Sequence, residues 1–136
     1  MTVDGAETGR CELGLLLLVG VHRDDTEADA AKLAKKLANV RLFNDAQGKI
    51  NLSLLDLAGA GSVLAISNFT VYGDTQKNRR PSFVESAPFE RGRELFDLFV
   101  AQLRGCGLHV ETGTFGAHME VALVNDGPVT VIVDTT

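Results

Sequence analysis

Two hydroxyl residues, Ser67 and Thr70, stand where a buried strand is expected to end. Asn68 and Phe69 lie between them, directly after the apolar run 62–67. A polar segment that leaves a buried strand often presents functional groups. Thr70 is therefore a candidate nucleophile. A hydroxyl at such a position can equally satisfy backbone groups at the strand exit, and we favour that second interpretation.

Few other side chains are spaced for chemistry. His22, His109 and His118 are isolated from one another, and Cys11 and Cys106 lie far apart with no C-x-x-C motif. Carboxylates are plentiful, but no spacing pairs them, and no G-x-S-x-G motif or phosphate-binding loop is present. The sequence therefore predicts neither a metal site nor a cofactor.

The size and composition favour one globular domain, residues 1–136. Hydrophobic residues make up 45% of the chain, and no apolar run is long enough to span a bilayer. The N-terminus lacks the layout of a signal peptide, so a cytoplasmic location is expected. The net charge of −5 argues against broad adhesion to nucleic acid, although K-N-R-R at residues 77–80 forms one local basic patch.

Two amphipathic helices are expected to position these groups. The first, residues 26–38, has Thr26 as its cap and Asp29 three residues further on, an arrangement similar to a capping box. The second follows Ser86, which we expect to be its cap, with Ala87 and Pro88 in the first turn. Its buried stripe comprises Leu95, Phe96, Phe99, Val100 and Leu103.

The remaining segments predict strands. A continuous apolar run at 13–21 indicates a strand covered on both faces. Further strands are expected at 2–4, 40–43, 62–67, 108–112, 119–124 and 129–133, while the state of 50–57 stays open. Short turns link the last strands, so we expect them to be antiparallel. The predicted fold is α+β: a curved, barrel-like, largely antiparallel sheet covered by the two helices.

The segment N-D-G-P, residues 125–128, separates two valine-rich runs. Proline cannot donate a hydrogen bond to a sheet, so its place at the start of the second run requires an explanation. A β-turn is one explanation, and the residues alone leave a more specialised role open.

Six segments, in order along essentially the whole chain, resemble the D-aminoacyl-tRNA deacylase family. They are T-V-D-G at 2–5, N-V-R-L-F-N-D-A-Q-G-K-I-N-L-S-L at 39–54, S-N-F-T-V-Y-G-D at 67–74, K-N-R-R-P-S-F at 77–83, T-G-T-F-G-A-H-M at 112–119 and N-D-G-P-V-T at 125–130. The resemblance implies the fold of that family and the hydrolysis of D-aminoacyl-tRNA, which proofreads amino-acid handedness during translation. Glycyl-tRNA mischarged on tRNA-Ala is implied as a further substrate.

The resemblance also implies a homodimer in which each subunit lends a cis Gly127-Pro128 peptide to its partner's active site. The main-chain carbonyls of this pair would bind the ammonium group and occupy the space that an L side chain needs. A D side chain points outward, and glycine has none to exclude. Selectivity then comes from exclusion, and no tailored side-chain pocket is needed.

Catalysis is implied for the strand end Ser67, Asn68, Phe69 and Thr70. Their backbone N–H groups would stabilise a developing oxyanion, helped by the 2′-hydroxyl of the terminal adenosine. Lys77, Arg79 and Arg80 would contact tRNA phosphates. Phe69 or Tyr72 would stack on the terminal adenine or, alternatively, belong to the core.

The sequence departs from the family pattern at two places. Asn68 stands where the family has glutamine, and the family's first strand, whose arginine supports the Gly-Pro pair, does not precede T-V-D-G here. These departures motivate one alternative, a non-catalytic module that binds aminoacyl-tRNA. A second alternative is a hydrolase of small esters that depends on Thr70.

Overall fold

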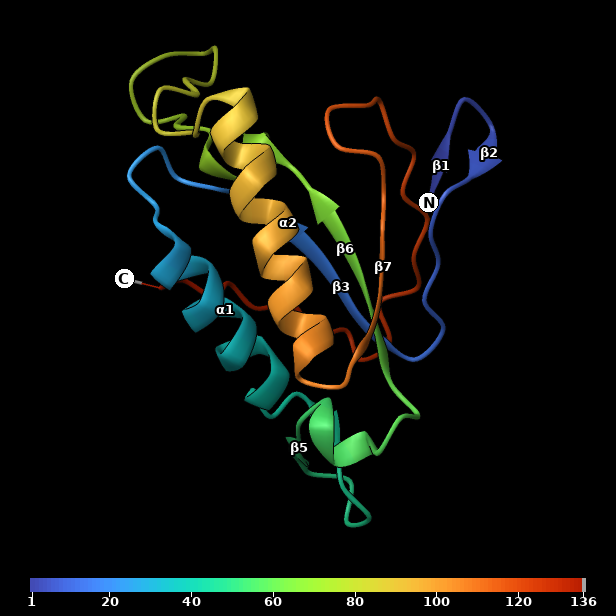
Figure 1. Cartoon of the computed structure of the whole chain (residues 1–136). Coiled ribbons are helices and arrows are strands. Elements are labelled where there is room, and N and C mark those ends of the chain that lie inside the picture. The colour runs from blue at the N-terminus through green and yellow to red at the C-terminus, as the bar shows by residue number, and fades with distance from the viewer. Residues whose placement is uncertain (136) are drawn as a thin grey trace.

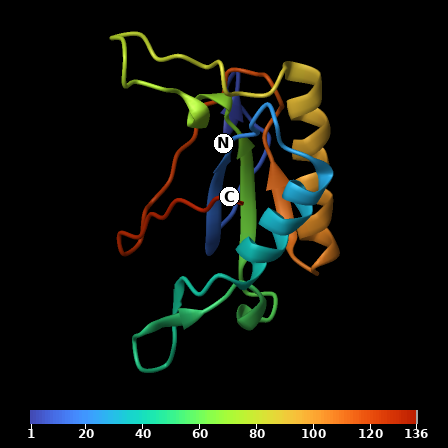
Figure 2. The same cartoon turned by 90° about the vertical axis from the view of Figure 1, so that its left-hand side faces the viewer.

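The computed structural model describes residues 1–135, and its centre is a three-stranded parallel sheet (Figure 1). Strand β6 (Ser62–Ser67) lies between β3 (Gly14–Val19) and β7 (His109–Thr112). Helices α1 (Glu27–Asn39) and α2 (Phe89–Gly105) cover one face of this sheet (Figure 2). Parallel neighbours need crossover connections, which the two helices supply.

Helix α1 begins as its capping residues predict. The Asp29 carboxylate accepts hydrogen bonds from the backbone N–H of Thr26, at 2.9 Å, and from its hydroxyl, at 3.2 Å. Ala34 and Ala38 are buried where the helices pack together, because small side chains allow a close approach. The predicted first helix is thus confirmed.

The main core fills the space between helices and sheet. Phe96, Phe99 and Leu103 of α2 pack against Val63 and Ala65 of β6, all at most 4% exposed. This confirms the predicted stripe of the second helix. Because β6 is buried at the centre, the polar groups at its carboxyl end have a rigid support.

Two hairpins flank the central sheet. β1 (Thr2–Val3) pairs antiparallel with β2 (Ala6–Glu7), and β4 (Phe43–Asn44) pairs antiparallel with β5 (Ile50–Leu52). The segment whose state was open contains β5 and then a short 3-10 helix, Leu55–Leu57. The chain thus combines two α-helices with β-strands, as predicted, but within residues 1–135 the strands form three sheets and not one.

The prediction of a largely antiparallel sheet was wrong, and the predicted barrel-like curvature is not confirmed. Only the two hairpins are antiparallel, β7 pairs parallel with β6, and no sheet among residues 1–135 closes on itself. The short turns after the second helix were expected to join antiparallel strands. The strand expected at 108–112 does form as β7, but α2 is the crossover that brings it parallel to β6.

The strands predicted at 119–124 and 129–133 do not form within the described chain. The only bridge there joins Thr2 to Glu120. Val124 is 93% exposed and Ile132 is 96% exposed. Strand propensity is expressed only against a partner strand, and no neighbouring strand within residues 1–135 pairs with these segments.

Two local predictions also need correction. Leu18 of β3 is 53% exposed, so the second face of this strand is only partly covered. Helix α2 begins at Phe89 with Pro88 as its N-cap, and Ser86 therefore does not cap it. None of the helices in the described part of the chain is long and apolar enough to cross a membrane.

Candidate active site

A cleft of about 550 Å³ opens at the carboxyl end of β6. Ser67, Asn68 and Phe69 line it from the strand end, Ser86 from the following loop and Phe89 from the start of α2. Ligands of sheet proteins commonly bind beyond the carboxyl ends of parallel strands. Its volume lies in the range of small-molecule sites.

Asn68 caps the 3-10 turn η2 (Phe69–Tyr72), which follows the strand. Its side-chain Oδ1 accepts hydrogen bonds from the backbone N–H of Thr70, at 3.1 Å, and from the Thr70 hydroxyl. The Thr70 proton is thus directed at a neutral amide oxygen. A nucleophilic hydroxyl instead needs a base to accept its proton, so the geometry favours the structural role of Thr70.

The backbone of the same turn leaves one amide for a ligand. The N–H of Asn68 donates to the carbonyl of Val19 at 2.8 Å, and the N–H of Thr70 is taken by Asn68 Oδ1. Phe69 begins the turn, and the first N–H groups of a helix have no intrahelical acceptor. The Phe69 N–H is therefore one main-chain donor that the strand end can offer to a ligand.

Aromatic rings form the walls of the cleft. Phe69 and Phe83 meet edge to face at 5.1 Å between centroids, as do Phe89 and Phe115. Phe69 is 59% exposed, so it is not a core residue. These rings give the cleft apolar surfaces on which a planar base can stack.

Tyr72 lies outside this cleft. Its ring meets His22 edge to face at 5.2 Å, and burial raises the pKa of its hydroxyl. It lines a different and larger hollow. Of the two aromatic residues proposed for stacking, only Phe69 is in position.

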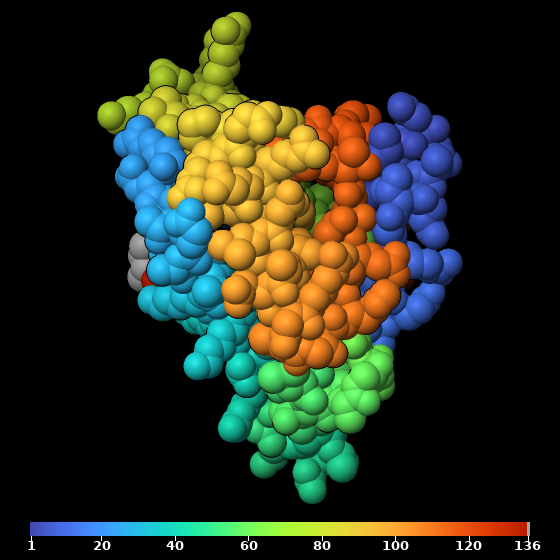
Figure 3. Space-filling model, in the orientation of Figure 1, coloured from blue at the N-terminus to red at the C-terminus, as the bar shows by residue number. Residues whose placement is uncertain are grey.

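The basic residues Lys77, Arg79 and Arg80 lie on an exposed loop that projects beyond the start of α2 (Figure 3). Two backbone hydrogen bonds between Asp74 and Ser82, of 2.7 and 2.8 Å, close the base of this loop. Within residues 1–135, none of the three cations forms a salt bridge. Their charges are thus available to an external anion.

Gly127 and Pro128 are joined by a cis peptide bond at the exposed tip of the C-terminal segment. Asn125 spans this tip with two hydrogen bonds. Its Oδ1 accepts from the N–H of Val129 at 3.0 Å, and its Nδ2 donates to the hydroxyl of Thr130 at 2.9 Å. Asn125 and Thr130 belong to the N-D-G-P-V-T segment, and the sequence alone did not indicate that they hold the tip in shape.

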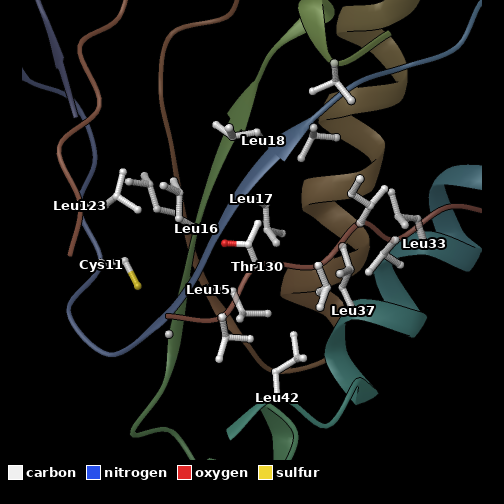
Figure 4. A pocket seen from close by; sticks show the side chains of 18 of the residues that line it. Cys11, Leu15, Leu16, Leu17, Leu18, Leu33, Leu37, Leu42, Leu123 and Thr130 are labelled. Atoms are coloured by element: carbon white, nitrogen blue, oxygen red, sulfur yellow. The ribbon is translucent and has the colours of Figure 1, made fainter. Parts of the chain in front are cut away.

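The C-terminal segment lies on the sheet face opposite the helices as far as its tip (Figure 2), and its end then reaches α1, where Lys32 and Lys36 donate to the carbonyls of Thr135 and Asp134. It borders an apolar hollow of about 1590 Å³, where Leu15 and Leu17 of β3 face Leu33 and Leu37 of α1 (Figure 4). Gly127 and Pro128 line this hollow and not the cleft below Ser67. A single chain therefore does not bring the predicted filter and the predicted catalytic strand end into one pocket.

The cleft offers little for acid–base or metal chemistry. Among the described residues that line it, His118 is the only titratable side chain. No cluster of three or more His, Cys, Asp or Glu side chains within residues 1–135 could hold a metal ion. The polar groups that line the cleft are therefore chiefly those of the main chain and of neutral side chains.

The chain matches the family described as D-Tyr-tRNA(Tyr) deacylase over residues 1–134. It is 53% identical over 135 residues to the D-aminoacyl-tRNA deacylase of Bacillus cytotoxicus and 52% identical to that of Bacillus mycoides. Both alignments cover 99% of this chain and 91% of the relative. The chain belongs to this deacylase family.

Two solved structures share the fold. One, titled c-Myc DNA Unwinding Element Binding Protein, has a TM-score of 0.90 and 31% identity over 99% of this chain and 91% of its own. The other is titled a probable eukaryotic D-amino acid tRNA deacylase. Its TM-score is 0.71 at 18% identity over 86% of this chain and 83% of its own, which is evidence for the fold alone.

Proposed function

We propose that this protein hydrolyses the ester bond of D-aminoacyl-tRNA and releases a D-amino acid and tRNA. The observation that carries the proposal is the cleft at the end of β6, where the Phe69 N–H is left for a ligand. It occurs in a chain that matches the deacylase family over nearly its whole length. Proofreading during translation is the corresponding cellular role.

The proposed reaction relies on main-chain groups and on the substrate. Water adds to the ester carbonyl, and the Phe69 N–H stabilises the developing oxyanion. The carbon–oxygen bond to the ribose then breaks, and the ribose oxygen takes up a proton. The 2′-hydroxyl of the terminal adenosine assists the attacking water, in a cleft where His118 is the only titratable side chain among the described lining residues.

The terminal adenosine occupies the aromatic cleft in this proposal. The cleft has the volume and the four phenylalanine rings to hold one stacked base, and Phe69 lies at its exposed rim. The ester would then lie beside the amide at the strand end. Lys77, Arg79 and Arg80 reach the phosphates of the preceding nucleotides.

Chiral selection is assigned to the main-chain carbonyls of Gly127 and Pro128 in a homodimer. Within one chain this pair lines the hollow and not the cleft, so a filter at the cleft requires the tip of a second subunit. Exposed apolar side chains flank the tip, including Val124 and Ile132, and their burial would stabilise the dimer. Because exclusion acts on a side chain, glycyl-tRNA would also be hydrolysed.

The relative titled as a DNA unwinding element binding protein raises a second function, which this chain supports less well. Duplex DNA binding depends on many phosphate contacts, whereas this chain has a net charge of −5. Its three grouped cations suit a small contact with an acceptor end.

The decisive experiment compares D-Tyr-tRNA and L-Tyr-tRNA in single-turnover hydrolysis. We expect release of D-tyrosine at least about a hundredfold faster than release of L-tyrosine, which corresponds to about 2.7 kcal/mol of discrimination. Equal rates would contradict the chiral function. Tight binding of D-Tyr-tRNA without release would instead support the non-catalytic binding module.

A further inference from the structure

Ser86 is a polar residue of the cleft to which sequence analysis assigned only a structural role outside it. Its hydroxyl donates a hydrogen bond of 2.9 Å to the carbonyl oxygen of Phe69. Ser86 is half-buried and lines the cleft together with Ser67, Asn68 and Phe69. It therefore contacts the main chain of the turn that carries the proposed oxyanion donor.

The peptide group between Phe69 and Thr70 is held at both ends. Ser86 binds its carbonyl oxygen, and Asn68 Oδ1 accepts from its N–H. Because a peptide group is planar, two such contacts on opposite sides fix its rotation about the chain. These two contacts, the clamp, hold one of the two peptide planes that meet at Phe69. They therefore limit how far the neighbouring plane, which carries the Phe69 N–H, can turn at Phe69.

The preceding peptide group has its own anchor. The carbonyl oxygen of Asn68 accepts a hydrogen bond of 3.2 Å from the N–H of Val71. The N–H of Asn68 also donates to the carbonyl of Val19 in β3 at 2.8 Å, so the clamp acts on a turn whose start is already attached to the neighbouring strand. Loss of either hydrogen bond to the Phe69–Thr70 peptide should change the direction of the Phe69 N–H without unfolding the turn.

The backbone around Ser86 is fastened independently of its hydroxyl. The N–H of Ala87 donates to the carbonyl of Val21 at 2.9 Å, and the N–H of Arg23 donates to the carbonyl of Glu85 at 2.8 Å. These bonds persist when the hydroxyl is removed. Replacement of Ser86 by alanine thus isolates the contact with Phe69.

We propose that Ser86 is a positioning residue for deacylation, whose hydroxyl fixes the Phe69–Thr70 peptide and so aims the Phe69 N–H at the ester carbonyl. The proposal rests on the proposed function and deepens it. Ser86 acts through the main chain and takes no proton from the substrate. Its effect should therefore fall on the rate of the chemical step and leave substrate affinity nearly unchanged.

The test measures kcat and KM for D-Tyr-tRNA in wild type, Ser86→Ala, Ser86→Thr and the control Ser82→Ala. We expect Ser86→Ala to lower kcat about tenfold, the effect of one misaligned hydrogen bond, with KM changed less than about twofold. Ser86→Thr keeps the hydroxyl and should restore at least half of the activity. Ser82 is an exposed serine of the same loop, and its variant should match wild type.

The double variant Asn68→Ala, Ser86→Ala tests whether the two side chains act on one peptide group. If they do, the double variant should be little slower than Asn68→Ala alone, because one lost contact already frees the plane. If the double variant lost kcat by the product of the two single losses, the proposal would be overturned. An unchanged kcat in Ser86→Ala, or a Ser86→Thr variant that does not restore kcat, would also overturn it. A raised KM with normal kcat would also overturn it, since it would indicate contact with the substrate.

The wild-type rate separates this proposal from the proposed function. If wild type does not release D-tyrosine, the proposed function fails. If wild type is active and Ser86→Ala is equally active, only the positioning role fails. Thermal unfolding of each variant, expected within about 2 °C of wild type, separates a change of aim from a loss of fold.

Discussion

At the scale of single residues, Thr70 distinguishes the two mechanisms that the sequence left open. Its hydroxyl donates to Asn68 Oδ1, a neutral acceptor that cannot remove the proton. The N–H of the same residue is also taken by Asn68. Both polar groups of Thr70 thus stabilise the turn, which favours water as the nucleophile of the proposed reaction.

Thr70→Val should therefore retain most of the deacylase activity. Valine has the same shape and keeps the N–H bond to Asn68, so we expect kcat within about fivefold of wild type, the effect of one lost hydrogen bond. Single-turnover hydrolysis of D-Tyr-tRNA measures this change. A loss of about a thousandfold or more would show instead that Thr70 is a nucleophile.

The end of strand β6 could be predicted from the sequence, but the hydrogen bonds around it could not. Apolar patterning placed Ser67 at the end of β6, because burial determines that pattern. Ser86 was assigned to a helix cap, since serine before Ala-Pro is typical of that position. Which acceptor its hydroxyl reaches depends on η2, 17 positions earlier in the chain, and no local pattern encodes that contact.

At the scale of elements, the start of α1 shows how a local signal fixes a helix. The N–H of Thr26 donates to the Asp29 carboxylate, and this bond is the main reason that the pKa of Asp29 lies below its ordinary value of 3.8. A carboxyl whose pKa is lowered on folding stabilises the fold at pH values above its unfolded pKa. That contribution disappears as the pH falls through the lower, folded pKa.

Asp29→Ala should accordingly lower the melting temperature at pH 7 by about 3 °C. The difference from wild type should shrink as the pH decreases below about 4, because the wild-type carboxylate is then protonated. Thermal unfolding between pH 2 and pH 7 checks both effects. Asp97→Ala, which removes an exposed carboxylate from the interior of α2, is the control and should show no such convergence.

The tip that carries Gly127 and Pro128 has no strand to hold it, so its shape depends on Asn125. We expect Asn125→Ala to lower the ratio of the hydrolysis rate of D-Tyr-tRNA to that of L-Tyr-tRNA about tenfold, because both hydrogen bonds across the tip are lost. Asn125→Asp keeps the acceptor for Val129 and should have a smaller effect. Asn39→Ala, on the surface of α1, should leave the ratio unchanged, and an unaltered ratio in Asn125→Ala would contradict this role.

The elements around this tip mark the limit of prediction from one sequence. Valine-rich runs at 119–124 and 129–133 predicted strands, yet the chain there has only the bridge between Thr2 and Glu120. Such apolar runs indicate that the segment favours burial, but they do not indicate which other part of the protein buries it. The helices were predicted well because capping and periodicity are local properties.

At the scale of the whole molecule, charge is distributed unevenly. The chain is acidic overall, but Lys77, Arg79 and Arg80 project together on one exposed loop (Figure 3). A contact of this size should contribute a modest, salt-dependent part of tRNA affinity. Its removal should therefore affect binding more than the chemical step.

Replacement of all three loop cations by alanine should raise KM for D-Tyr-tRNA about tenfold and leave kcat nearly unchanged. The dependence of KM on salt should also become shallower, because fewer counterions are released on binding. Replacement of Lys35, Arg93 and Lys49, cations on other exposed surfaces, removes the same charge and is the matched control. Equal effects of the two triple variants would show that only net charge matters.

Because the Gly127–Pro128 tip and the cleft lie on separate surfaces, we predict complementation between two impaired variants. Asn68→Ala impairs the cleft, and Gly127→Ala impairs the tip, because Gly127 has φ of +148° and an added Cβ would lie 2.9 Å from the backbone nitrogen of Val129. If the tip acts on the partner subunit, a mixed dimer contains one site with an intact cleft and an intact tip. The unmixed variants contain none.

We therefore expect each variant alone to be at least about tenfold slower than wild type on D-Tyr-tRNA. Mixing equal amounts under conditions of subunit exchange should restore about a quarter of wild-type activity, because half of the dimers are mixed and each has one competent site. Activity that stays at the average of the two variants would mean that cleft and tip cooperate within one chain. In that case Gly127 and Pro128 must move from the hollow beside β3 to the end of β6 before the ester is hydrolysed.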